Sequence, residues 1–177
     1  MNNTPLQPAT QAQHELLTFR LGEEEYGIDI LQVQEIRSYE PPTRIANAPP
    51  HIKGVVNLRG VIVPVIDLRL RMGYAETRID HLTAVVVLNV GGKVSGVMVD
   101  AVSDVVNLPG STVKPVPAVG QQEGGCAHHI RGIATLEERL LMLLDMEALM
   151  TDSQPELAAL ALQQAIQTQR GVAAAAA

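Results

Sequence analysis

The chemically reactive side chains of this sequence are few, and one group of them could bind a metal ion. Cys126 lies close to two adjacent histidines, His128 and His129, and thiolate and imidazole are ligands that zinc prefers. A structural zinc site needs a fourth ligand at suitable spacing, and two adjacent histidines cannot easily both face one ion. We therefore expect a flexible loop here, with no metal and no cofactor. A small metal-dependent enzyme using Cys126 and His128 is the disfavoured alternative.

Two aspartates, Asp67 and Asp145, could in principle form a pair of catalytic carboxylates. Each directly follows an apolar run, where an aspartate side chain can accept the unpaired N–H groups of a helical turn. Helix capping is therefore the better interpretation. The sequence also lacks a complete phosphate-binding loop, a G-x-G-x-x-G motif and a G-x-S-x-G motif. We predict no catalytic residue, and a protein that is not an enzyme.

The segments that would position these side chains centre on a predicted β-hairpin. Two apolar runs, 55–58 and 61–66, flank Arg59-Gly60, and their many β-branched residues favour strands. Glycine can adopt the positive φ that a tight reversal needs, so Arg59 is expected at the tip of an apolar hairpin. A short helical turn over 68–72 should follow Asp67. If the turn at 31–36 lies against this hairpin, Glu35 pairs with Arg59.

The hairpin unit occurs twice in the chain. A shift of 78 positions places His51-Ile52-Lys53-Gly54 on His129-Ile130-Arg131-Gly132, and it places Asp67 on Asp145. A shift of 69 relates a second pair of segments, 22–36 and 91–105, whose glycines and acidic residues coincide. The sequence therefore predicts two copies of one β unit. Arg59 has no counterpart in the second copy, where Glu137 takes its place, so this asymmetry is a candidate binding feature.

Composition limits both the fold and the function. The chain has 177 residues, 46% of them hydrophobic, yet only four are aromatic, so the core must consist of valine, isoleucine and leucine. A net charge of −6 and few aromatic rings argue against nucleic-acid binding. A single cysteine permits no internal disulfide and suits a reducing compartment. The sequence shows no leader and no apolar run of membrane-spanning length, so we expect a cytoplasmic protein without direct membrane insertion.

Short strands with turns at near-regular spacing predict an all-β architecture of two small barrels. We expect a disordered tail over 1–14, the folded domain with its two barrel subdomains over 15–150, and a C-terminal segment over 151–177 that contains a helix from 155 to 168. The Pro- and Gly-rich stretch from 109 to 125 is expected to be a loop. Residues 31–39 should form a helical turn followed by a strand.

Several ordered motifs closely resemble the CheW family of bacterial chemotaxis coupling proteins. They span roughly residues 15–150 and are specific in combination. They are Leu21-Gly22-Glu23-Glu24-Glu25-Tyr26-Gly27-Ile28-Asp29-Ile30, Val33-Gln34-Glu35-Ile36, Arg44-Ile45-Ala46-Asn47, Ile52-Lys53-Gly54-Val55-Val56-Asn57-Leu58-Arg59-Gly60-Val61-Ile62-Val63-Pro64, Asn89-Val90-Gly91 and Gly96-Val97-Met98-Val99-Asp100-Ala101-Val102-Ser103-Asp104-Val105.

The resemblance implies two interleaved five-stranded SH3-like β-barrels with short helices and a C-terminal helix. It implies an adaptor that joins the cytoplasmic tips of chemoreceptors to the histidine kinase CheA, contacts other adaptor copies, and is recruited to membrane receptor arrays. A scaffold of another two-component pathway, similar to a kinase regulatory domain, is the alternative. Kinase and array contacts would involve Lys114 and Val119. The receptor groove between the barrels would involve Val33, Glu35, Ile36, Lys53, Arg59, Ile62, Val102 and Val105.

Overall fold

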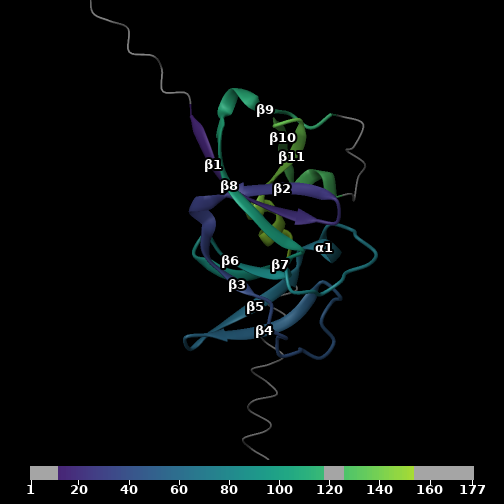
Figure 1. Cartoon of the computed structure of the whole chain (residues 1–177). Helices are drawn as coiled ribbons and strands as arrows, with labels where there is room; N and C mark the ends of the chain where they lie inside the picture. The colour runs from purple at the N-terminus through teal and green to yellow at the C-terminus, as the bar shows by residue number, and fades with distance from the viewer. Residues whose placement is uncertain (1–11, 118–125, 154–177) are drawn as a thin grey trace, which may run out of the picture.

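A computed structural model describes residues 12–117 and 126–153, which fold mostly into strands arranged in two sheets (Figure 1). The first sheet has the strand order β8 (Ala101–Pro109), β1 (Gln13–Leu21), β2 (Glu24–Asp29), β11 (Arg139–Leu144), β10 (Ile130–Leu136) and β9 (Val113–Lys114). The second has the order β3 (Val33–Ser38), β6 (Ala84–Val90), β7 (Lys93–Val99), β5 (Val61–Asp67) and β4 (Ile52–Leu58). The predicted all-β class is confirmed.

Short helical segments connect these strands. They are the 3-10 turns η1 (Ile30–Gln32), η2 (Gly110–Thr112) and η4 (Cys126–His129), the α-helix α1 (Leu68–Arg71), and a helix that is described over residues 146–153. Within the described segments, no helix has the length and apolar character needed to cross a membrane. The turn before β3 and the helix after Asp67 both form where the sequence placed them.

The two copies of the repeat exchange their hairpins between the barrels. Strand β5 of the first copy pairs in parallel with β7 of the second, and Val65 faces Gly96. Strand β11 of the second copy pairs in parallel with β2 of the first, and Leu143 faces Gly27. These residues are related by the two shifts found in the sequence, 78 and 69. The predicted duplication is therefore confirmed, and each SH3-like barrel is assembled from both halves of the chain.

Equivalent glycines close both barrels. In the first copy, a Cβ on Gly54 would lie 2.1 Å from the Thr43 carbonyl oxygen, where Thr43 forms a bridge with Val55. In the second copy, a Cβ on Gly132 would lie 3.1 Å from the Lys114 carbonyl oxygen of β9. Both glycines follow a β-bulge in their strand. The neighbouring backbone excludes a side chain at Gly54, whereas a Cβ on Gly132 would first meet Val113 Cγ1, at 2.6 Å.

The main hydrophobic core lies between the barrels. On β6, Val86 and Leu88 pack into this central cluster, whereas Val85 and Val87 point into their own barrel. On β1, Leu17 joins the central cluster and Leu16 packs inside the other barrel. Strands buried on both faces explain why runs such as 84–88 are apolar without alternation. The fold therefore has three apolar layers, one inside each barrel and one between them.

Two boundaries differ from the sequence expectations. Strand β1 begins at Gln13, inside the stretch 1–14 that was expected to be a disordered tail, because its first residues pair with β8. The stretch expected to be only a loop after Pro109 contains η2 and the short strand β9, which pairs with Ala134 and Ile133 of β10. The predicted helix over 155–168 lies outside the described residues.

Candidate functional site

Four of the apolar residues predicted for the groove lie on sheet faces that point toward the space between the barrels. Cross-strand partners in a sheet share a face. Within the register of β3, Val33 is opposite Leu88 and Ile36 is opposite Val86. Within that of β8, Val102 is opposite Phe19 and Val105 is opposite Leu17. All four partners belong to the central core cluster.

These residues extend the central core to the surface. Val33 and Val102 are half-buried and pack against the central cluster. Ile36 and Val105 are 47% and 42% exposed. Ile62 is 57% exposed and lies on the same face of β5 as Ile66, which is part of the cluster. The apolar members of the predicted set therefore lie on faces that adjoin the inter-barrel core, and Ile36, Ile62 and Val105 remain exposed.

The predicted contact between Glu35 and Arg59 is present. Arg59 Nη2 donates to Glu35 Oε2 at 2.8 Å and joins β3 to the tip of the β4–β5 hairpin. Arg59 and Gly60 have φ values of 52° and 86°, as a type I′ turn requires, and the Asn57 side chain accepts from the Gly60 N–H at 2.7 Å. Arg37 lies 3.8 Å from the other oxygen of Glu35. Glu35 therefore holds the exposed side chain of Arg59 against β3.

Lys53 does not lie with this pair. It occupies the opposite end of β4 from Arg59, and its Nζ lies 3.9 Å from Asp67 Oδ2. Lys114 is exposed on β9, at the edge of the first sheet. Val119 lies outside the described residues. The structure thus joins Glu35 to Arg59 and directs Val33, Ile36, Val102 and Val105 toward the central core, whereas Lys53 lies at the other end of β4.

Sequence reasoning missed a buried charge network centred on Arg69. The guanidinium donates to both oxygens of Asp67 at 2.9 Å and to Asp100 Oδ1 at 2.7 Å. Burial lowers the pKa of Arg69, but hydrogen bonds and charges from Asp67 and Asp100 outweigh it and raise that pKa above its ordinary value. Asp100 Oδ2 also accepts from the Gly22 N–H at 2.7 Å. Because Gly22 belongs to the β1–β2 turn, the network ties one barrel to the other.

A second polar contact reinforces this connection. The Tyr26 hydroxyl on β2 lies 3.1 Å from the Tyr74 hydroxyl, which also hydrogen-bonds to Glu24. Tyr74 follows α1, so this contact also joins the two barrels.

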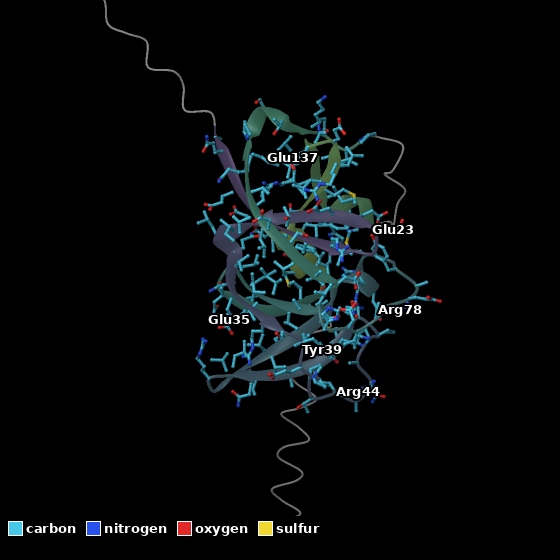
Figure 2. All side chains as sticks on the ribbon, viewed as in Figure 1. Glu23, Glu35, Tyr39, Arg44, Arg78 and Glu137 are labelled. Carbon is cyan, nitrogen blue, oxygen red and sulfur yellow. The ribbon has the colours of Figure 1, made fainter. Side chains whose placement is uncertain are left out.

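The Arg69 network lies away from the proposed groove. Arg78, whose carbonyl accepts from Arg69, and Glu35 are on opposite sides of the molecule (Figure 2). In the sequence, the charged residues Asp67, Arg69 and Arg71 stand close together, but only Asp67 was given a role there, as a helix cap.

The aspartates are helix caps, as predicted. Asp67 Oδ1 accepts from the Arg69 N–H at 3.1 Å, and Asp145 Oδ1 accepts from the Ala148 N–H at 3.0 Å. In both copies the aspartate N–H donates at 2.7 Å to the carbonyl of the repeat-related histidine, His51 or His129. The two carboxylates therefore have equivalent structural positions in separate barrels and do not form a catalytic pair.

Comparison with known proteins gives a consistent result. The model of the CheW-like domain matches residues 15–154. The chain is 49% identical over 140 residues to a chemotaxis protein CheW of Klebsiella aerogenes, covering 79% of this chain and 83% of the relative. It is 33% identical to a chemotaxis protein CheW of Bacillus subtilis, with coverage of 76% and 85%. The crystal structure of the scaffolding protein TtCheW from Thermoanaerobacter tengcongensis aligns with a TM-score of 0.70 and 28% identity, covering 84% of this chain and 93% of that one.

Proposed function

This chain belongs to the CheW family of non-catalytic chemotaxis adaptors, and on that premise we propose that it binds a chemoreceptor tip and the histidine kinase CheA at the same time. The receptor site is the apolar surface between the barrels. The observation that supports this assignment is the register of β3 and β8, which directs Val33, Ile36, Val102 and Val105 toward the core between the barrels. Exposed apolar groups that continue a core favour a protein partner over a small substrate.

The chemistry of this surface suits a helical hairpin tip. Partly buried Val33 and Val102 form its floor, and exposed Ile36, Val105 and Ile62 would lose their contact with water on binding. Arg59 and Glu35, held together at 2.8 Å, would fix the orientation of the receptor at the edge. Lys53 pairs with Asp67 instead, so we expect its replacement to affect the barrel more than receptor binding.

The kinase would dock on a separate surface, since coupling requires both partners to bind together. Lys114 on β9 and Val119 are the candidates for contact with CheA or with neighbouring adaptors. A change in receptor state then alters kinase activity through different contacts in the assembled complex, and this needs no catalytic group in the adaptor. We propose that the protein acts in the cytoplasm and is recruited to membrane receptor arrays.

The test compares two isoleucines with similar exposure. Ile36→Lys places a charge in the proposed groove, and Ile79→Lys places one on the loop near Arg78, on the other side of the molecule; Ile79 is 53% exposed. In a binding assay with a receptor cytoplasmic fragment, we expect Ile36→Lys to weaken binding by about tenfold or more. We expect Ile79→Lys to bind as the wild type does. Equal binding by wild type and Ile36→Lys would show that this groove is not the receptor site.

A further inference from the structure

Three metal-ligating side chains converge near the end of the folded region. His128 Nε2 lies 3.1 Å from Asp152 Oδ2, and His129 Nε2 lies 3.5 Å from the same oxygen. The ligand atoms of all three residues lie within 4.8 Å of one another. Two adjacent histidines were not expected to face one ion easily, yet the Nε2 atoms of this pair both lie near one carboxylate oxygen. The 3-10 turn η4 brings their rings together, with ring centroids 3.7 Å apart.

The backbone holds these groups in place. Asp152 stands seven residues after Asp145, two helical turns along the helix over 146–153. The start of that helix is bonded to His129 itself, whose carbonyl accepts from the Asp145 N–H at 2.7 Å. Leu149, Met150 and Ser153 of the helix are buried, and Ser153 Oγ donates to the Leu149 carbonyl. The carboxylate therefore lies at a fixed position relative to the imidazole of His129.

The spacing of the three groups suits a small divalent cation. At Zn–N and Zn–O distances of about 2.0–2.1 Å, two ligands of a tetrahedral ion lie roughly 3.3 Å apart, close to the two measured separations. His129 is 1% exposed, and burial lowers its pKa.

Two features limit the expected affinity. Arg71 Nη2 lies 4.0 Å from Asp152 Oδ2 and shares the charge of the carboxylate. In addition, His129 Nδ1 is buried without a hydrogen-bond partner among the described residues, although ligating histidines usually donate their second N–H to a partner. The geometry therefore suits a weaker, exchangeable site better than a structural zinc of the closed four-ligand kind.

The cluster is not a by-product of the repeated fold. At the positions that precede these residues by 78, the first copy has Pro50, His51 and Tyr74, so only the buried histidine recurs. The capping aspartate and its bond to the histidine carbonyl are present in both copies. His128 and Asp152 are additions of the second copy, and the barrel closes without them in the first.

We propose that His128, His129 and Asp152 form a binding site for a divalent transition-metal ion, with Zn²⁺ as the representative ion and one coordination position open to water. The bound ion would fasten the helix over 146–153 to the turn that precedes β10. This site is distinct from the receptor groove and does not depend on the proposed coupling function.

The test is a calorimetric titration of the full-length protein with Zn²⁺ in a non-chelating buffer. We expect one ion per chain, and we expect His128→Asn and Asp152→Asn each to weaken binding by about tenfold or more. Both replaced side chains are more than 40% exposed, at 56% and 46%, and unfolding without metal checks that the variants remain folded. Co²⁺ should give the strong visible absorption of a tetrahedral complex in the wild type and lose it in both variants.

Two further variants separate this site from other ligands in the chain. His81→Asn removes an exposed histidine elsewhere and should bind Zn²⁺ as the wild type does. Cys126→Ser tests the neighbouring thiol and should leave the affinity within about twofold of the wild-type value, a difference of about 0.4 kcal/mol. Three results would each overturn the proposal. They are no Zn²⁺ binding by the wild type, equal Zn²⁺ binding by wild type and His128→Asn, and loss of Zn²⁺ binding in Cys126→Ser.

Discussion

Replacing Arg69 with methionine should destabilise the protein more than removing any of its exposed charges. The side chain of Arg69 is 2% exposed and donates to Asp67, Asp100 and the Arg78 carbonyl. Methionine fills much of the same space but leaves these acceptors without their donor. Asp67, with 0% exposure, keeps only the Lys53 ammonium at 3.9 Å as a nearby cation among the described residues.

The size of the effect follows from this burial. Removing one partner of a buried ion pair typically costs about 3–5 kcal/mol, because the remaining charge is stranded away from water. For a chain of this length, the melting temperature should fall by roughly 6–20 °C. Asp100 is 27% exposed, so Asp100→Asn keeps a solvated acceptor and should cost only about 1 kcal/mol. Arg44→Met, at an exposed site, should stay within about 0.5 kcal/mol of the wild type.

Urea unfolding followed by circular dichroism measures these differences directly. At pH 7 the deficit of Arg69→Met should exceed that of Asp100→Asn and that of Arg44→Met by about 2 kcal/mol or more. A deficit below about 1 kcal/mol at pH 7 would show that the network does not stabilise the contact between the barrels.

Three further predictions concern local geometry. Glu35→Arg should weaken receptor binding, and adding Arg59→Glu should restore part of that binding. Either change should shift the free energy of unfolding by no more than about 1 kcal/mol. A double variant that binds receptor no better than Glu35→Arg in a pull-down would contradict the pairing. Gly54→Ala should unfold far more readily than Gly60→Ala, because its Cβ would lie 2.1 Å from backbone while Gly60 has open space; equal melting temperatures would contradict the close approach. Glu138→Gly should raise the unfolding free energy by about 1 kcal/mol, since φ is 69° there, and a loss of stability would refute the strain argument.

The sequence revealed the repeat and its hairpins because local rules decide those features. Arg59-Gly60 marked a two-residue turn between adjacent strands. Asp67 and Asp145 marked helix starts, and each caps an N–H group only a few residues further along the chain. The exchange of hairpins between barrels was implied only by family resemblance, because parallel pairing such as that of Val65 with Gly96 joins segments far apart in the chain. No local pattern specifies that kind of contact.

The polar clusters were harder to foresee for a similar reason. Arg69 meets Asp100 across 31 residues, and periodicity carries no signal for such a contact. The convergence of His128 and His129 on Asp152 also depends on a tertiary feature, the docking of a helix against a turn. The pairing of Glu35 with Arg59 could be proposed because both residues stood at predicted turns, which limited where their side chains could lie.

Coupling requires that receptor and kinase occupy the adaptor together, so simultaneous binding is the most direct test. Receptor cytoplasmic fragments displayed on vesicles can be sedimented with this protein and CheA, alone and in combination. We predict that CheA sediments with receptor vesicles in proportion to added adaptor, and that Ile36→Lys removes this dependence. Displacement of the adaptor from the receptor by CheA would mean that the two partners compete for one surface, and it would contradict the proposed adaptor mechanism.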